Sequence, residues 1–155
     1  MKFLADRNLG KLTKWLRILG YDTACHAGSI DRNFLKRGAQ EGRIVLTRRR
    51  DMAKRNFSGR MFIVYSDNVT EQIKEIVETF SLHLDPQRFF TICLFCNEPI
   101  QTVRKADVKE RVPQYVYQTQ EHFQICPQCG KLYWPGTHKD NVLSYLKQHN
   151  LIHPP

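Results

Sequence analysis

Short apolar runs and longer amphipathic segments alternate through the first eighty residues of the chain. The runs have the length and the β-branched content of strands, and between them apolar residues recur every three or four positions, as on one face of a helix. Strands that alternate with helices form a mostly parallel sheet covered by helices on both faces. We therefore expect an α/β fold. The pattern predicts strands at 2–6, 21–27, 43–47 and 61–66, and helices at 9–19, 32–42 and 69–80.

The periodicity breaks from Leu84 onward, and we place a domain boundary between residues 82 and 88. The expected division is a larger α/β domain at 1–83 and a small domain at 84–155. Within the second domain the pattern predicts two strands and a final helix, at 101–108, 114–119 and 141–151.

Four of the five cysteines form two CxxC pairs, separated by residues 97–125. Each CxxC turn directs two thiolates at one ion, and two such pairs complete the tetrahedral coordination of zinc. Because all four ligands come from the protein, we expect one structural zinc ion per chain in a zinc ribbon. Two disulfides or four free thiols are the alternative. The fifth cysteine, Cys25, is expected to be a small buried apolar residue. The predicted zinc ligands are Cys93, Cys96, Cys126 and Cys129.

The composition, 41% hydrophobic and 25% charged, is that of a soluble globular protein. No apolar stretch approaches the roughly 20 residues that span a bilayer, and the N-terminal residues lack the pattern of a signal peptide. We therefore expect a cytoplasmic protein with no membrane partner, whose cysteines are kept reduced.

The positive charge is concentrated in the first part of the chain. Residues 1–60 hold 15 Lys and Arg against 5 Asp and Glu, a net +10, whereas residues 61–155 hold 9 against 10, a net −1. A concentrated positive field attracts polyanions, which favours a nucleic-acid partner over ordinary surface charge. The expected nucleic-acid contacts are Lys11, Lys14, Arg17, Arg48, Arg49 and Arg50.

Acidic residues stand at or near the ends of the predicted strands. In open parallel sheets ligands bind beyond the carboxyl ends of the strands, so these carboxylates are expected to meet at one edge. Such a cluster binds Mg²⁺ or Mn²⁺, which activates water for attack on a phosphodiester. Taken singly, each acid has a structural alternative, as a helix cap or the start of a turn. The candidate catalytic residues are Asp6, Asp31, Asp51 and Asp67.

Several motifs, in this order and spacing, resemble those of the Mut-seven C-terminal RNase domain family, and the resemblance covers essentially residues 2–146. It implies a PIN-like nuclease domain of three layers, followed by a zinc ribbon. It also implies a metal-dependent ribonuclease that acts on RNA, with Asp6 and Asp31 matching its first two catalytic acids. The motifs are FLADRNLGKLTKWLRILGYDT, then Asp31, EGRIVLTR, RFFTICLFCNEPI, VP and FQICPQCGKLYWPGTH.

The chain departs from this family after its third strand, where an aspartate is expected and Arg49 stands instead. Arginine cannot ligate a cation and repels one already bound. Three explanations stay open. The first is that Asp51 replaces the lost acid, because two residues of extended chain keep the side-chain direction. The second is that Arg48, Arg49 and Arg50 hold phosphates in a protein that binds RNA without cutting it, and the third is that the segment is a solvated basic loop.

Two functions follow from these readings. The first is a metal-dependent ribonuclease in which Asp51 or Asp67 completes the site with Asp6 and Asp31. The second is a catalytically impaired RNA-binding protein that uses the basic first part and the zinc ribbon. A third, more remote, is a protein-interaction domain. The sequence gives no indication of oligomeric state.

Overall fold

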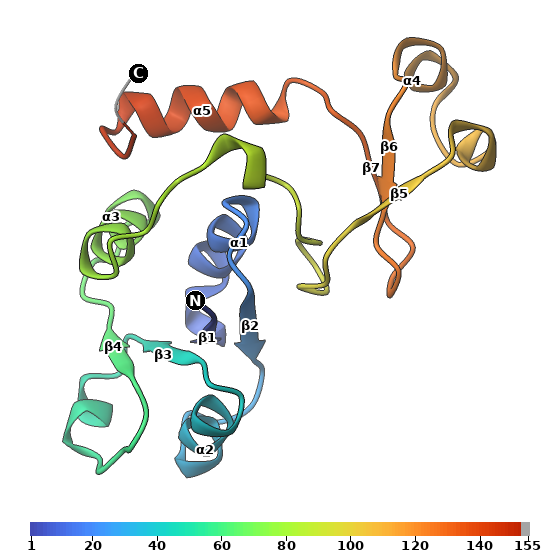
Figure 1. The fold of residues 1–155 in the computed structure, drawn as a ribbon. Coiled ribbons are helices and arrows are strands. Elements are labelled where there is room, and N and C mark those ends of the chain that lie inside the picture. Colours follow the sequence, from blue (N-terminus) through green and yellow to red (C-terminus); the bar gives the residue numbers. More distant parts are fainter. Residues whose placement is uncertain (153–155) are drawn as a thin grey trace.

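A computed structural model describes residues 1–152. Its first part contains every strand and helix that the periodicity predicts, which confirms the α/β class (Figure 1). The strands are shorter than predicted because one or more terminal residues of each predicted run do not pair. The elements are β1 (Phe3–Asp6), α1 (Gly10–Ile18), β2 (Thr23–His26), α2 (Arg32–Gln40), β3 (Ile44–Thr47), β4 (Met61–Ile63) and α3 (Val69–Thr79).

The four strands form one parallel sheet in the order β2-β1-β3-β4. The central strand β1 pairs on both sides, with Phe3 opposite Thr23 of β2 and Ile44 of β3. The chain passes from β1 to β2 on one side and returns to β3 on the other. The carboxyl ends of β1 and β3 therefore form the topological switch point, where open α/β sheets bind ligands.

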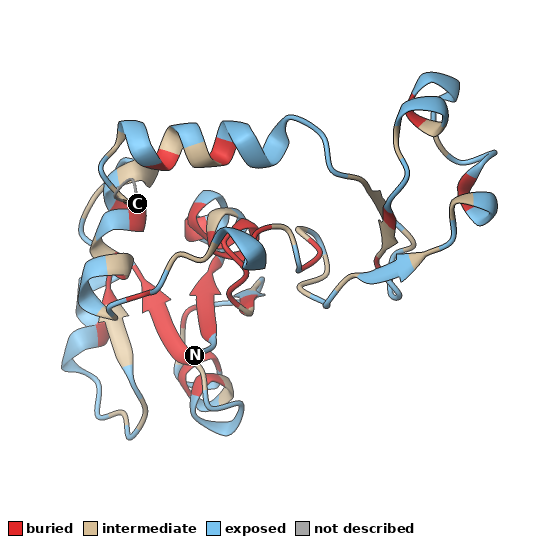
Figure 2. Cartoon of the chain, turned by 45° about the horizontal axis from the view of Figure 1, so that its top comes forward, coloured by how far each residue is buried: buried red, intermediate tan, exposed pale blue. Residues whose placement is uncertain are grey.

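Helices cover both faces of this sheet, which confirms the predicted three layers. Successive residues of β1 point to opposite faces. Phe3 and Ala5 pack with α1 and α3, whereas Leu4 packs with Phe34 of α2. Figure 2 shows the central strands β1 and β3 buried, whereas much of the helix surface is exposed. On edge strand β2, Cys25 is exposed, so the expectation that it is buried was wrong.

The small domain contains a three-stranded antiparallel sheet in the order β5-β6-β7. Its core is small and includes Val108, Val116 and Phe123. The predicted strand at 114–119 is instead helix α4, because only Val116 of this segment turns into the core and Pro113 precedes its first turn. The predicted strand at 101–108 ends at Val103. The elements are β5 (Gln101–Val103), η4 (Lys105–Val108), α4 (Gln114–Thr119), β6 (Phe123–Ile125) and β7 (Leu132–Tyr133).

The last helix, α5 (His138–Gln148), returns from the small domain to the first part of the chain (Figure 1). Its Val142 and Leu146 are buried in the same core cluster as α1 and α3. The two parts thus share this helix. The division into 1–83 and 84–155 stays a prediction, and residues 153–155 lie outside the described part. Among residues 1–152, no helix has the length and apolarity needed to cross a bilayer.

Candidate zinc centre and nucleic-acid interface

The two CxxC pairs come together although 29 residues separate them, at 97–125. The sulfur atoms of all four cysteines lie within 4.8 Å of one another, and Sγ of Cys93 is 3.8 Å from Sγ of Cys129. Four sulfurs at a Zn–S distance of about 2.3 Å stand about 3.8 Å apart at tetrahedral corners. None of the cysteines is in a disulfide. The predicted cysteines therefore fit one zinc ion and leave no position for a catalytic water.

Hydrogen bonds prepare Cys93 for metal binding. Burial raises the pKa of its thiol, but hydrogen bonds from the Tyr133 hydroxyl (3.2 Å) and the backbone N–H of Cys96 (3.5 Å) outweigh burial and lower the pKa to about 6. A thiolate is the form that ligates zinc. The contact with Cys129 raises the pKa of Cys96 to about 12, so the first charge of the cluster is carried by Cys93.

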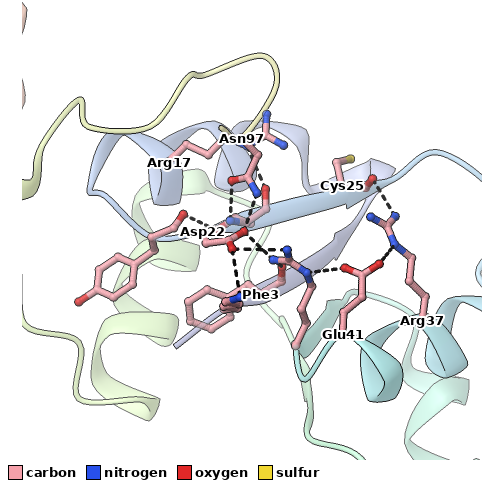
Figure 3. A network of polar contacts seen from close by, with 11 residues as sticks. Phe3, Arg17, Asp22, Cys25, Arg37, Glu41 and Asn97 are labelled. Carbon is pink, nitrogen blue, oxygen red and sulfur yellow. Dashed lines mark hydrogen bonds and ion pairs between the residues drawn. The ribbon is translucent and has the colours of Figure 1, made fainter. Parts of the chain in front are cut away.

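The first cysteine turn is fixed to the start of β2 by a polar network (Figure 3). The side chain of Asn97 accepts a hydrogen bond from the backbone N–H of Thr23 at 2.8 Å and donates one to Asp22 at 2.5 Å. Arg17 donates to the carbonyls of Thr23 at 2.9 Å and Leu94 at 2.7 Å. These contacts join the zinc centre to the α/β domain.

The same network changes the prediction for Arg17. Its side chain was expected to contact nucleic acid, but it is buried and its guanidinium is occupied by backbone carbonyls. Burial also lowers its pKa. Arg17 is therefore not available for phosphate. Lys11 and Lys14 are exposed on α1, as nucleic-acid contacts require.

The carboxylate of Asp6 lies at the switch point between β1 and β3. It is fully buried, and both of its oxygens accept hydrogen bonds. Oδ1 accepts from the backbone N–H of Asn8 at 2.7 Å, and Oδ2 accepts from the hydroxyl of Thr47 at 2.6 Å. Asp6 thus ties the ends of the two central strands together and caps η1 (Arg7–Leu9).

Asp31 has the capping role that was its structural alternative. Its Oδ1 accepts hydrogen bonds from the backbone N–H groups of Asn33 (2.9 Å) and Phe34 (3.3 Å), at the start of α2. A cap of this kind stabilises a helix by about 1 kcal/mol. The second carboxylate oxygen of Asp31 is not used by the cap.

The other two candidate acids are paired with the arginines that follow β3. Arg49 donates to both oxygens of Asp51, at 3.1 and 2.6 Å, and Arg48 donates to Asp67. Asp51 lies in a 3-10 helix, η2 (Arg50–Lys54), and not in extended chain. The argument that Asp51 keeps the direction of residue 49 was therefore wrong in its geometry.

Arg49 extends over the switch point. Its Nη1 donates to the carbonyl of Ile30 at 3.0 Å, next to Asp31. The hydrogen bonds with Asp51 raise the pKa of Arg49, and the charge of Asp6 contributes in the same direction. A fixed guanidinium thus lies in the field of the carboxylates that were expected to hold a metal ion.

The arrangement does not fit the Mg²⁺ or Mn²⁺ ion that the resemblance implies. Within residues 1–152, the four cysteines form the one group of three or more metal-ligating side chains with ligand atoms this close together. Both oxygens of Asp6 and of Asp51 already accept hydrogen bonds. Arginine supplies no ligand to magnesium, and the guanidinium of Arg49 among these carboxylates repels a divalent cation.

Tyr65 is a candidate contact that the sequence analysis missed. It follows β4 at the same edge of the sheet and is 60% exposed, and the guanidinium of Arg50 lies 5.5 Å from its ring centroid. Glu75 accepts hydrogen bonds from the backbone N–H groups of Tyr65 and Ser66, at 3.0 and 2.7 Å, and so fixes the loop. A position just after a strand would have marked Tyr65 as a candidate, but the predicted strand at 61–66 included this residue.

The fold and the cysteine cluster define a three-layer α/β domain joined to a zinc ribbon. The family model of the Mut7-C RNAse domain matches residues 1–146. The chain therefore belongs to the Mut7-C RNAse domain family, which confirms the resemblance and indicates a nuclease-like function. Searches of curated proteins and of solved structures found no match.

Proposed function

We propose that this chain binds RNA at the carboxyl edge of its parallel sheet, through Arg48, Arg49 and Arg50, and that its capacity for metal-dependent hydrolysis is impaired. The observation that supports this most is the position of Arg49. Its guanidinium lies at the switch point of the sheet, in the field of Asp6 and bonded to Asp51.

Arg49 has donors left for phosphate. It uses one N–H on each of its three nitrogens, for Asp51 and for the carbonyl of Ile30. The second N–H on both terminal nitrogens remains, and arginine presents such a pair to phosphate in bidentate fashion. Its bound partners hold the guanidinium in place, which reduces the entropy lost when RNA binds.

The ion pairs at this edge are exposed and open to exchange. The side chain of Asp67 is 90% exposed and that of Asp51 is 54% exposed. Exposed pairs contribute only about 0 to 1 kcal/mol, so a phosphate can replace either carboxylate at little cost. The aspartates then act as placeholders that position the arginines before RNA binds.

Zinc has a structural part in this function. When bound to Cys93, Cys96, Cys126 and Cys129 it closes the ribbon and holds the first cysteine turn. That turn is fixed to β2 through Asn97. The ion supplies folding free energy and no chemistry on the RNA.

The test is the affinity for labelled single-stranded RNA, measured by fluorescence anisotropy across a salt series. Replacing Arg48, Arg49 and Arg50 together by Ala should lower affinity by at least about tenfold and reduce the log-log salt slope by about 2, since each phosphate contact contributes about 0.7. The matched control replaces Lys74, Arg104 and Lys109 together by Ala, an equal loss of charge at exposed positions away from this edge. Equal losses in both proteins would contradict the proposal.

Metal-dependent hydrolysis of RNA is the second candidate. It is favoured by Asp6 and Asp31, which keep their places at a strand end and at a helix start beside the switch point. The same RNA incubated with Mn²⁺ or Mg²⁺ distinguishes the two functions. Cleavage that EDTA, Asp6→Asn and Asp31→Asn each abolish would establish hydrolysis and overturn impairment. We expect no such cleavage.

A further inference from the structure

A cavity of about 840 Å³ lies between α1, α5 and the ribbon, away from the arginines described above. One wall is formed by α1 and α5, and the facing wall by the ribbon strands β6 and β7. Figure 1 shows α5 above α1 and the ribbon strands to one side. Leu94 and Tyr133, which adjoin the zinc ligands, also line it.

The cavity combines positive charge with aromatic surface. Its lining contains no Asp or Glu among the described residues. The lysines and histidines that line it are exposed, and they come from α1, the ribbon and the start of α5. They are Lys14, His122, Lys131, His138 and Lys139.

Aromatic rings stand on both walls. Trp15 of α1 stacks on Tyr145 of α5 with centroids 4.7 Å apart and planes at 24°, which fixes the orientation of both rings. On the ribbon wall, Trp134 packs against Phe123 at 6.3 Å. Trp15 and Trp134 both line the cavity and are only partly buried.

We propose that this cavity binds a segment of single-stranded RNA, with bases stacked on Trp15 and Trp134 and phosphates held by Lys14, Lys131 and Lys139. Aromatic platforms inside a basic groove are the common means of binding unpaired strands, because every base has a face that stacks. A duplex keeps its bases stacked internally and offers none to the rings. An apolar peptide would use the rings but give Lys14, Lys131 and Lys139 no anionic partner.

This inference rests on the proposed function for the identity of the ligand, but it concerns a separate site. Arg48, Arg49 and Arg50 at the sheet edge bind the phosphates of any strand, whereas the cavity selects unpaired bases. Together they give the protein a preference for single-stranded over double-stranded RNA.

Tryptophan fluorescence reports on the cavity directly, because both tryptophans of the chain line it. Oligoadenylate should quench the emission, whereas the same strand paired with oligouridylate should not. Inorganic polyphosphate, a polyanion without bases, should not quench either. Trp15→Phe and Trp134→Phe should each remove part of the quenching. Absence of quenching at saturating oligoadenylate overturns the proposal, as does equal quenching by polyphosphate.

Charge reversal tests the lysines. Lys14→Glu, Lys131→Glu and Lys139→Glu combined should lower oligoadenylate affinity at least about tenfold and reduce the salt slope by about 2. The matched control carries Lys36→Glu, Lys74→Glu and Lys109→Glu, which change the net charge equally at exposed positions outside the cavity. Equal losses in the two proteins overturn the lysine contacts.

The arginine variant separates the two sites. If the edge proposal alone fails, replacing Arg48, Arg49 and Arg50 leaves affinity unchanged while oligoadenylate still quenches. If the cavity proposal alone fails, that variant binds weakly and the wild type shows no quenching. Quenching by an apolar peptide that oligoadenylate does not displace would assign the cavity to a protein partner instead.

Discussion

Arg49 and Asp51 form a bidentate ion pair two residues apart, with Nε and Nη2 of the guanidinium donating to the two carboxylate oxygens at 3.1 and 2.6 Å. The pair decides how the edge of the sheet is used. Asp51 was the acid expected to replace the missing metal ligand. It is bound instead by Arg49, the residue that stands where the family has that ligand. Around Arg49 the site consequently presents N–H donors, as the proposed binding of phosphate requires.

The pairing predicts a measurable shift in Asp51. Hydrogen bonds from Arg49 hold the pKa of Asp51 below its usual 3.8, so the carboxylate stays ionised below that pH. Arg49→Gln removes the charge, and the pKa of Asp51 should rise toward its usual value. Carboxyl carbon NMR titration measures this. An unchanged Asp51 curve would mean that the pair does not form in solution.

Restoring the acid at position 49 should restore divalent-metal binding. Arg49→Asp removes the guanidinium from the field of Asp6, frees Asp51 and adds a carboxylate after β3. Calorimetric titration with Mn²⁺ should show binding to the variant and none at the same concentration to the wild type. Arg104→Asp, an equal charge change in the ribbon, is the control. Equal Mn²⁺ affinity in wild type and Arg49→Asp would contradict this account.

The cysteine cluster predicts about one zinc ion per chain by elemental analysis. Cys126→Ser removes a buried ligand, and we expect zinc content to fall well below one with loss of ribbon structure, because zinc binding supplies folding free energy. Cys25→Ser is the control, since Cys25 is exposed and outside the cluster, and it should retain the metal. Full zinc occupancy in Cys126→Ser would contradict a four-cysteine site.

Asn97 is expected to be the most sensitive residue at the junction of the two parts. It bonds Thr23 and Asp22 and has a φ of 63°, in the left-handed region. Asn97→Ala loses these hydrogen bonds and adds backbone strain, for an expected loss of about 2 to 3 kcal/mol in the free energy of unfolding.

Asn97→Gly separates the two contributions, because glycine adopts this conformation without strain. We expect it to be about 1 kcal/mol more stable than Asn97→Ala in urea unfolding of the zinc-loaded protein. Equal stability of the two variants would show that the backbone conformation contributes nothing.

The sequence by itself determined the α/β order and the zinc cysteines. Both depend on short-range patterns: the side-chain period of strands and helices, and the CxxC spacing that lets two sulfurs reach one ion. Local patterns failed where a single contact decided the structure. Residues 114–119 have the aromatic and β-branched content of a strand, yet they form α4 around the one buried side chain of Val116.

Only the tertiary structure decided the use of each charged side chain. Arg17 and Arg49 are the same residue type in the sequence. Packing against the first cysteine turn buries Arg17, whereas Arg49 extends over the sheet edge. The return of α5 likewise placed Trp15 and Trp134 around one cavity. The burial of Arg17 and the cavity depend on partners many residues apart in the chain, and an ionised side chain takes the partner that packing brings within hydrogen-bonding distance.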